Sequence, residues 1–380
     1  MITDISDSIE ACAAHYGNDA DAMRQYLING QQKAVELPNR GPILFDADGQ
    51  LNSEIRAAYL KYGFYIFESV LDAQELKQRF AVKNGDKVNA KGEPALGIDC
   101  KAPNLLWAKP LGDPLGGPPI ANGRHQVKLF EPTAAIDAPK ESPFVLLGSL
   151  QFSPACLRVY AHPELLKVAQ AINGKDFAPF HECLFIKEPG LGAAVSWHQD
   201  GDTHWDDPAF DAQIHGFNFM AQAYGSTAVN GVWVVPGSHV LGRQDIKQMV
   251  VDAGSERLPD ALPIICNAGD VVICNRQLVH GSFANTGFEP RITINFGFHK
   301  RSSVLDVKGA GIHSEAATYD AAMIEKRAHA IGYAIEARRA QYPNETPYCY
   351  QPLAHSSTDF SWQPDTLAKL KDYNLLDLSI

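Results

Sequence analysis

Residues 271–299 read VVICNRQLVHGSFANTGFEPRITINFGFH, and this stretch decides the fold that we predict for the chain. It holds three short segments with the composition of β-strands, separated by turn residues. In the last segment Arg291, Thr293 and Asn295 alternate with isoleucine and phenylalanine, so polar and apolar side chains occupy opposite faces of one strand. We expect the polar face to line a cavity and the apolar face to meet flanking helices.

The same pattern continues upstream to about residue 177, in PFHECLFIKE, AAVSWHQD, GFNFMAQAY and GVWVVPG. Turn signals at Pro189-Gly190, Asn230-Gly231 and Pro236-Gly237 separate these segments. Many short strands joined by turns predict a sandwich or a jelly-roll barrel. The fold class is therefore predicted to be mainly β with flanking α-helices.

Helical periodicity lies on both sides of the strand region. PELLKVAQAI at 163–172 has a proline at its start and Asn173-Gly174 as its stop. After residue 314 an apolar stripe predicts a long helix that ends before Pro343. The other predicted helices lie in residues 1–40, 53–67 (turning strand-like at Gly63), 71–80 and 365–376.

We predict a single domain over residues 1–380. Residues 84–143 are rich in glycine, proline and lysine and are interpreted either as a lid over the site or as surface decoration. The four predicted parts are an N-terminal helical and strand segment at 1–83, the insertion at 84–143, the jelly-roll core at 144–300 and a helical C-terminal extension at 301–380.

The composition excludes several classes of protein. A net charge of −11 argues against nucleic acid as the main partner. The acidic start has no apolar signal-peptide core, and no run approaches the ~20 apolar residues of a membrane helix. Seven cysteines without a C-x-x-C pair predict neither a disulfide framework nor a zinc ribbon, so we expect a reducing, cytoplasmic location.

The candidate metal ligands begin with His198 and Asp200, which share one face of a strand because they are two residues apart. With His280 they supply two imidazoles and one carboxylate. This set holds ferrous iron on one face and leaves positions open for a chelating 2-oxoacid and dioxygen. Arg291, eleven residues after His280, offers a planar guanidinium for the far carboxylate of that acid.

Each of these assignments has a competitor. An isolated H-x-D motif also fits a hydrogen-bonded His and Asp at a strand end. His204-Trp205-Asp206 repeats the spacing, but it lies in an acidic loop, so we interpret His204 as a solvated histidine or a substrate contact. Arg276 shares strand parity with His280 and competes with Arg291 for the anion; spacing favours Arg291.

Four ordered segments, FIKEPGLGAAVSWHQD, NGVWVVPGSH, AGDVVICNRQLVHGS and PRITINFGFH, resemble the phytanoyl-CoA dioxygenase family of iron(II)- and 2-oxoglutarate-dependent oxygenases. YLKYGFYIFESVLDAQEL is also similar to the start of that family. The resemblance implies a cupin-like, double-stranded β-helix barrel buttressed by helices. It also implies these roles: iron ligands His198, Asp200 and His280; 2-oxoglutarate contacts Arg291, Ser282 and Lys187, with an exposed edge lysine as the alternative for Lys187.

The chain departs from the family where substrate would bind. A tryptophan common in the family is missing from GFNFMAQAY, which suggests a reshaped pocket around Asn218, Met220 or Gln222. The insertion and the C-terminal helices lie outside the matched region, so a coenzyme-A ester is not carried over as substrate. We expect a soluble small molecule instead. The sequence does not predict the oligomeric state.

The expected activity is hydroxylation of an unactivated C–H bond with dioxygen and 2-oxoglutarate, releasing succinate and carbon dioxide. Asp200 occupies the position that is a small residue in related halogenases, which disfavours halogenation. Desaturation and epoxidation use the same oxidant and stay open. Two other classes also stay open: a zinc-type hydrolase or isomerase on the same barrel, and a barrel that only binds a small molecule.

Overall fold

The strand predicted from RITINFGFH is the centre of a large sheet. The computed structural model describes residues 4–73, 75–76, 105–115, 127–200, 215–309, 317–363, 365–370 and 373. Strand β12 (Arg291–His299) pairs antiparallel with β5 (Ala178–Lys187) on one side and with β7 (Gly216–Gln222) on the other. This central position explains why both faces of the strand are buried.

The large sheet has the order β1-β2-β10-β7-β12-β5-β4-β3, and its pairs are antiparallel except β1 with β2. A smaller sheet has the order β6-β11-β8-β9. The remaining bounds are β1 Arg40–Gly41, β2 Phe64–Phe67, β3 Leu105–Ala108, β4 Ser142–Leu147, β6 Val195–His198, β8 Trp233–Val234, β9 Leu262–Pro263, β10 Val271–Asn275, β11 His280–Ser282, and the separate hairpin β13 Lys308–Gly309 with β14 Ala317–Thr318.

From β5 to β12 the chain crosses repeatedly between these two sheets. Strands β5, β7, β10 and β12 belong to the large sheet, and β6, β8, β9 and β11 belong to the small one. This alternation is the connectivity of a double-stranded β-helix, so the predicted jelly-roll fold is confirmed. Residues from distant parts of the sequence are thereby brought to one interior.

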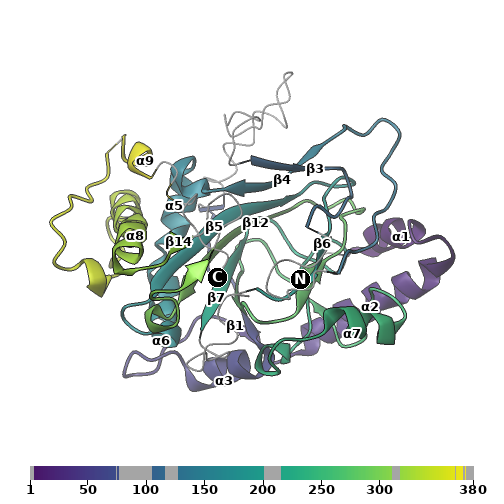
Figure 1. Ribbon diagram of the computed structural model, residues 1–380, viewed down its shortest axis with the longest axis horizontal. Helices are drawn as coiled ribbons and strands as arrows, with labels where there is room; N and C mark the ends of the chain where they lie inside the picture. Colours follow the sequence, from purple (N-terminus) through teal and green to yellow (C-terminus); the bar gives the residue numbers. More distant parts are fainter. Residues whose placement is uncertain are drawn as a thin grey trace.

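The two faces of β12 divide as its alternation predicts. Ile294, Phe296 and Phe298 are buried in the largest apolar cluster. Helices α5 (Pro154–Tyr160), α6 (Pro163–Asn173) and α8 (Ala321–Gln341) supply much of that cluster and lie on one side of the sheet in Figure 1. The polar residues of β12 therefore point to the opposite side, toward the small sheet.

The N-terminal helices lie near the small sheet. Helices α1 (Ser6–Ala14), α2 (Ala20–Glu36) and α7 (Ile246–Ala253) contribute to a second apolar cluster with Trp233. Tyr26 stacks on Trp233 with ring centroids 4.4 Å apart. The other helices are α3 Ser53–Tyr62 and α9 Thr366–Lys369, with 3₁₀ turns at Gly17–Asp19, Ser149–Gln151, Ser238–Val240, Arg301–Ser303 and Gln351–Leu353.

Helix α3 ends at Gly63, whose φ of 81° lies in the left-handed region that glycine adopts without strain. Strand β2 follows directly, so the predicted switch from helix to strand at Gly63 is confirmed. The predicted helix at 71–80 lies largely outside the described residues. None of the helices within the described ranges is long and apolar enough to cross a membrane.

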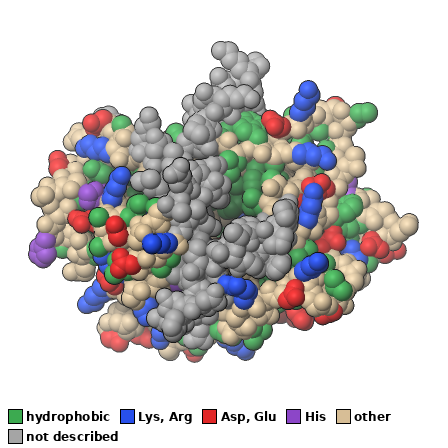
Figure 2. All heavy atoms as spheres, in the orientation of Figure 1, with side chains coloured by type: hydrophobic (Ala, Val, Ile, Leu, Met, Phe, Trp, Pro, Cys, Tyr) green, Lys and Arg blue, Asp and Glu red, His purple; other side chains and the backbone are tan. Residues whose placement is uncertain are grey.

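The predicted insertion contributes a strand. Of residues 84–143, the described ones include β3, which pairs with β4, and β4 in turn pairs with β5. The described part thus extends the large sheet beyond β5. Figure 2 shows a recessed area of hydrophobic side chains near the centre of this face of the molecule.

Candidate active site

The two histidines of the predicted metal site lie directly opposite each other in the small sheet. His198 ends β6 and His280 begins β11, and the two residues are paired in the antiparallel register. Their ring centroids are 4.1 Å apart. Residues paired across two antiparallel strands project side chains to the same side, so strand pairing alone brings these imidazoles together.

Both imidazoles are oriented by backbone carbonyl groups. His198 Nδ1 lies 2.7 Å from the oxygen of Ser196, and His280 Nδ1 lies 2.8 Å from the oxygen of Leu278. A carbonyl oxygen only accepts, so each Nδ1 donates to the backbone and each Nε2 is the ring nitrogen that faces Asp200. A backbone bond of this kind is what fixes the tautomer of a metal-binding histidine.

Asp200 completes the group. Its Oδ1 lies 3.5 Å from His198 Nε2, and its Oδ2 lies 4.0 Å from His280 Nε2. The ligand atoms of these three residues lie within 4.8 Å of one another, and no other such group of His, Cys, Asp or Glu occurs among the described residues. Three donors at metal–ligand distances of ~2.1 Å are separated by roughly 3 Å, so the set fits a divalent ion after small adjustments.

The charge of Asp200 is fixed by its surroundings. Burial works to raise the pKa of this carboxyl group. The hydrogen bond with His198 and the charges of Arg276 and the two imidazoles outweigh burial and hold the pKa well below its ordinary value. The site therefore presents an anionic carboxylate beside two imidazoles, which is the set of donor groups that ferrous iron takes in such triads.

The strand end that carries Asp200 is tied to the β10–β11 connection. The backbone N–H of Asp200 donates to the oxygen of Arg276 at 2.9 Å. The preceding side chain, Gln199, donates to the oxygen of Gln277 at 2.6 Å. Two consecutive residues are thus bonded to two consecutive carbonyl groups, which limits how far the carboxylate can move.

A second group of predicted residues forms a buried cationic site. Arg291 begins β12 and pairs with Lys187, which ends β5. The two side chains are only 4% and 2% exposed. Within the described ranges, no carboxylate lies within 4.0 Å of either cation, so both cations lack the ion-pair partner that buried charges ordinarily have.

Arg291 is oriented by neutral groups. Its Nε donates to Thr293 Oγ1 at 3.0 Å, and one terminal nitrogen donates to the oxygen of Asn230 at 3.4 Å. Thr293 in turn donates to Gln222 Oε1 at 3.1 Å. Burial lowers the pKa of Arg291 to about 10, so the guanidinium is charged at neutral pH.

Lys187 contacts β11, the strand that also carries His280. Its ammonium donates to Ser282 Oγ and to the oxygen of Phe283, and Ser282 donates to the oxygen of Gly231 at 3.0 Å. Burial, and then the charge of Arg291, lower the pKa of Lys187 well below its ordinary value. The interpretation of Lys187 as an exposed edge lysine is wrong, because its side chain is buried against Ser282 and Phe283.

The structure thus brings the six predicted residues into two groups. His198, Asp200 and His280 form the metal group, whereas Arg291, Lys187 and Ser282 form the cationic group. Strand β11 connects them, because His280 and Ser282 lie two residues apart on it. The two groups therefore belong to one interior between the sheets.

Arg276 is not part of the cationic group. Its Nε lies 3.8 Å from Asp200 Oδ2, on the metal side. The sequence offered no signal for this contact. His204, the competing ligand, lies outside the described residues.

Two further polar side chains lie on the inner faces of β7 and β12: Asn218, predicted at the reshaped pocket, and Asn295, predicted on the polar face of its strand. The amide oxygens of Asn218 and Asn295 are buried and accept no hydrogen bond. Gly297, which pairs with Asn218, leaves room for that amide: a Cβ there would lie 2.6 Å from Asn218 Oδ1.

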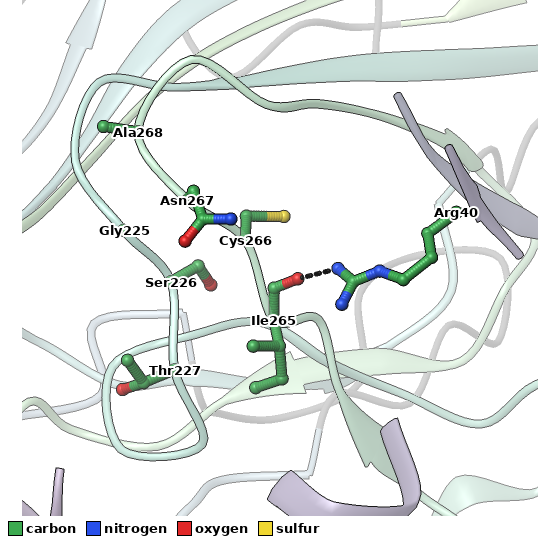
Figure 3. Close-up of a pocket in the computed structure, with 8 residues that line it drawn as sticks. All are labelled: Arg40, Gly225, Ser226, Thr227, Ile265, Cys266, Asn267 and Ala268. Atoms are coloured by element: carbon green, nitrogen blue, oxygen red, sulfur yellow. Dashed lines mark hydrogen bonds between the residues drawn. The ribbon is translucent and has the colours of Figure 1, made fainter. Parts of the chain in front are cut away.

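A separate cavity of about 200 Å³ lies between the loops at 225–227 and 265–268 (Figure 3). Arg40 reaches into its wall and donates to the oxygen of Ile265 at 2.6 Å. None of the predicted site residues lines this cavity. We assign the candidate active site to the interior between the sheets.

Sequence comparison identifies the family. The family model of phytanoyl-CoA dioxygenase matches residues 59–293, more than half of the chain. A curated relative, phytanoyl-CoA dioxygenase 1 of Oryza sativa subsp. japonica, is 28% identical over 110 residues. That match covers 26% of this chain and 37% of the relative, so it spans little more than a third of the relative's length.

Solved structures give weaker similarities. EctD from S. alaskensis, with 2-oxoglutarate and 5-hydroxyectoine bound, has a TM-score of 0.49 and 17% identity over 70% of this chain and 82% of its own. SnoK, a carbocyclase from nogalamycin biosynthesis, has a TM-score of 0.45 and 17% identity over 70% of this chain and 88% of its own. Similarities of this size do not bear on the reaction of this chain.

Proposed function

Because the chain belongs to the phytanoyl-CoA dioxygenase family, we propose that it is an iron(II)- and 2-oxoglutarate-dependent dioxygenase that hydroxylates an unactivated C–H bond of a small molecule. Succinate and carbon dioxide are the co-products. The observation that carries the proposal is the pairing of a His-Asp-His group with a buried cationic group on the same barrel interior. The metal group would bind the metal that the keto-acid end of a 2-oxoacid chelates, and the cationic group would bind its distal carboxylate.

In this proposal His198 Nε2, His280 Nε2 and the Asp200 carboxylate hold the iron. Bound iron and 2-oxoglutarate supply the oxygen-activating chemistry. The backbone bonds to both Nδ1 atoms keep the lone pairs directed at the metal position before any ion is present. The anionic state of Asp200 removes the need to expel a proton from this carboxyl group when the ion binds.

Arg291 receives the distal carboxylate of 2-oxoglutarate in the proposal, with Lys187 and Ser282 beside it. A guanidinium and a carboxylate form two parallel, charge-assisted hydrogen bonds, and this geometry fixes the long axis of the co-substrate. The bonds from Arg291 Nε to Thr293 and from one terminal nitrogen to Asn230 leave the remaining terminal N–H groups for the ligand. The arriving anion supplies a carboxylate partner, which no described residue places within 4.0 Å of either side chain.

The substrate in the proposal is a small molecule with a polar group near the oxidised carbon. The unpartnered amide oxygens of Asn218 and Asn295 support this, because a buried acceptor without a donor costs about 1–3 kcal/mol. A bound donor, such as a hydroxyl or amide N–H, removes that cost.

The zinc-type hydrolase and the binding-only barrel are the competing functions. Neither needs two buried cations that lack a carboxylate partner, so the cationic group favours the oxygenase. The reaction type, the cytoplasmic location and the single-domain division of the chain stay predictions.

The test is anaerobic reconstitution of the protein with iron(II) and 2-oxoglutarate, followed by oxygen. We expect tight iron binding, a visible absorption band that requires both ligands, and succinate release that a substrate panel stimulates. Turnover with zinc and without 2-oxoglutarate would establish the hydrolase instead. Binding of neither iron nor 2-oxoglutarate would overturn the proposal.

A further inference from the structure

Arg276 lies behind the candidate metal ligand Asp200. It is 4% exposed, and its Nε lies 3.8 Å from Asp200 Oδ2. The same residue accepts the backbone N–H of Asp200 at 2.9 Å through its carbonyl oxygen. Arg276 therefore contacts Asp200 twice, once through its backbone and once through its side chain.

The guanidinium of Arg276 is held in place from two other directions. Its plane lies over the ring of Phe180, with 3.6 Å between the guanidinium carbon and the ring centroid. One terminal nitrogen lies 2.9 Å from His299 Nε2. Arginine only donates, so His299 Nε2 is the acceptor and its imidazole is neutral in this arrangement.

A glycine makes room for this arrangement. A Cβ at Gly216 would lie 2.2 Å from His299 Cδ2, so any larger residue there displaces the imidazole. The backbone N–H of Arg276 also donates to the oxygen of Gly216, at 3.3 Å. Strands β7 and β12 and the β10–β11 connection thus jointly fix the guanidinium.

The two oxygens of Asp200 have different neighbours. Oδ1 lies nearer the imidazole of His198, and Oδ2 lies 3.8 Å from Arg276 and 4.0 Å from His280. Arg276 is directed away from the cationic group, because its Nε faces Asp200, one terminal nitrogen bonds His299 and one face covers the ring of Phe180. The distal carboxylate of the co-substrate stays assigned to Arg291.

We infer that Arg276 is a positioning residue for the metal centre: it holds the Asp200 carboxylate in the orientation that binds the ion. This inference rests on the proposed function, because it takes Asp200 as a metal ligand. The contact between Arg276 Nε and Asp200 Oδ2 is an ion pair and not a hydrogen bond. Outer partners of ligating groups commonly contribute about 10–100-fold to metal affinity. Nothing else in the described part of the chain brings a permanent cation within 4.0 Å of Asp200.

The experiment measures binding of cobalt(II) to the full-length protein by calorimetry and by its visible ligand-field absorption. Arg276→Met removes the charge and the hydrogen bonds but keeps an unbranched apolar side chain. We expect its Kd for cobalt to rise about 10–100-fold, with an altered absorption spectrum of the bound ion. Arg276→Lys restores the charge without the planar fork, so we expect an intermediate Kd.

Arg40→Met is the matched control. Arg40 also pairs with a carboxylate, Glu68 at 3.3 Å, and donates to a backbone oxygen, but it lies outside the metal group. Its cobalt affinity and spectrum should equal those of the wild type. If Arg276→Met does not fold, Phe180→Leu removes only the stacking surface and should change the spectrum in the same direction, by a smaller amount.

His198→Ala separates this inference from the proposed function. Loss of cobalt binding in His198→Ala, together with wild-type affinity and spectrum in Arg276→Met, would overturn the role of Arg276 and leave the metal site standing. Unchanged cobalt binding in His198→Ala would instead overturn the metal site itself.

Discussion

The metal group and the cationic group of the barrel interior differ in how their charges are balanced before any ligand binds. At the metal group the Asp200 carboxylate has Arg276 and two imidazoles beside it. At the cationic group Arg291 and Lys187 are buried together, and the described residues place no carboxylate within 4.0 Å of them. The first group is balanced by the protein, whereas the second is left for a ligand to balance.

This difference has energetic consequences. A buried cation without a partner destabilises the folded state, and an anionic ligand recovers that free energy on binding. A balanced group keeps its geometry in the absence of the metal, because its donors are already held by hydrogen bonds. We therefore expect substitutions in the two groups to separate metal affinity from co-substrate affinity.

The largest effect is expected from the metal ligands. His198→Ala and Asp200→Ala should each abolish iron-dependent turnover. They should also weaken metal binding by more than the ~10–100-fold that is typical of losing a residue that only contacts a metal ligand. The fold should stay intact, because neither side chain belongs to a main apolar cluster. Metal content after dialysis, circular dichroism and succinate release check this. Full activity in either variant would contradict the ligand assignment.

Arg291→Met should affect the other group alone. Losing one partner of a buried charge pair costs about 2–5 kcal/mol, which is roughly 30-fold or more in the Kd for 2-oxoglutarate. Metal affinity should be unchanged. The ligand-free variant should be no less stable than the wild type, because it no longer buries an unpaired guanidinium. Calorimetry measures the Kd for 2-oxoglutarate, and thermal unfolding measures the stability. A wild-type Kd for 2-oxoglutarate in this variant would contradict the assignment of the distal carboxylate to the cationic group.

Lys187 should make the stability of the protein depend on pH. Burial and the charge of Arg291 lower the pKa of Lys187 well below its ordinary value. Between the lowered pKa and the ordinary value, Lys187 is protonated in the unfolded chain but not in the folded chain. In that range, up to the ordinary lysine value of 10.5, the free energy of unfolding therefore rises with pH. Lys187→Met should remove that contribution, as denaturant titrations at several pH values would show.

The same group predicts proton uptake when 2-oxoglutarate binds. A carboxylate near Lys187 favours the ammonium form, so the affinity for 2-oxoglutarate should fall as pH rises through the lowered pKa. Calorimetry in buffers of different ionisation enthalpy should detect the uptake in the wild type and not in Lys187→Met. Equal uptake in the two proteins would assign the proton to another group.

The smallest effect is expected from Ser282→Ala. Its hydroxyl donates to Gly231 and accepts from Lys187, so it orients the cationic group without carrying charge. Loss of one such hydrogen bond costs about 1 kcal/mol, or roughly fivefold in the KM for 2-oxoglutarate. Steady-state succinate release at varied 2-oxoglutarate measures it. A loss as large as that of Arg291→Met would give Ser282 a role beyond orientation.

The sequence predicted those parts of the site that strand geometry controls. Alternation along β12 predicted that Arg291 and Thr293 share an inner face, and the spacing of His198 and Asp200 placed both on one side of β6. These predictions need only local backbone geometry. The jelly-roll fold followed from the many short strands and their turns.

The parts that failed depend on long-range pairing. Lys187 is buried because its side chain reaches Ser282 and Phe283, which lie 95 and 96 residues further along the chain. Alternation along one strand contains no information on such long-range contacts. Arg276 was grouped with His280 by parity, but the connection between β10 and β11 interrupts the alternation. Its side chain reaches Asp200 instead of the anion site.

The central claim is that both groups bind one molecule at once, a 2-oxoacid that chelates the metal at one end and meets Arg291 at the other. Titration of 2-oxoglutarate and of glutarate, which lacks the keto group, with and without cobalt(II) tests it most directly. We predict that cobalt tightens 2-oxoglutarate binding about tenfold or more and leaves glutarate unchanged, a coupling of ~1.4 kcal/mol. Equal affinities for 2-oxoglutarate with and without the metal would contradict the account.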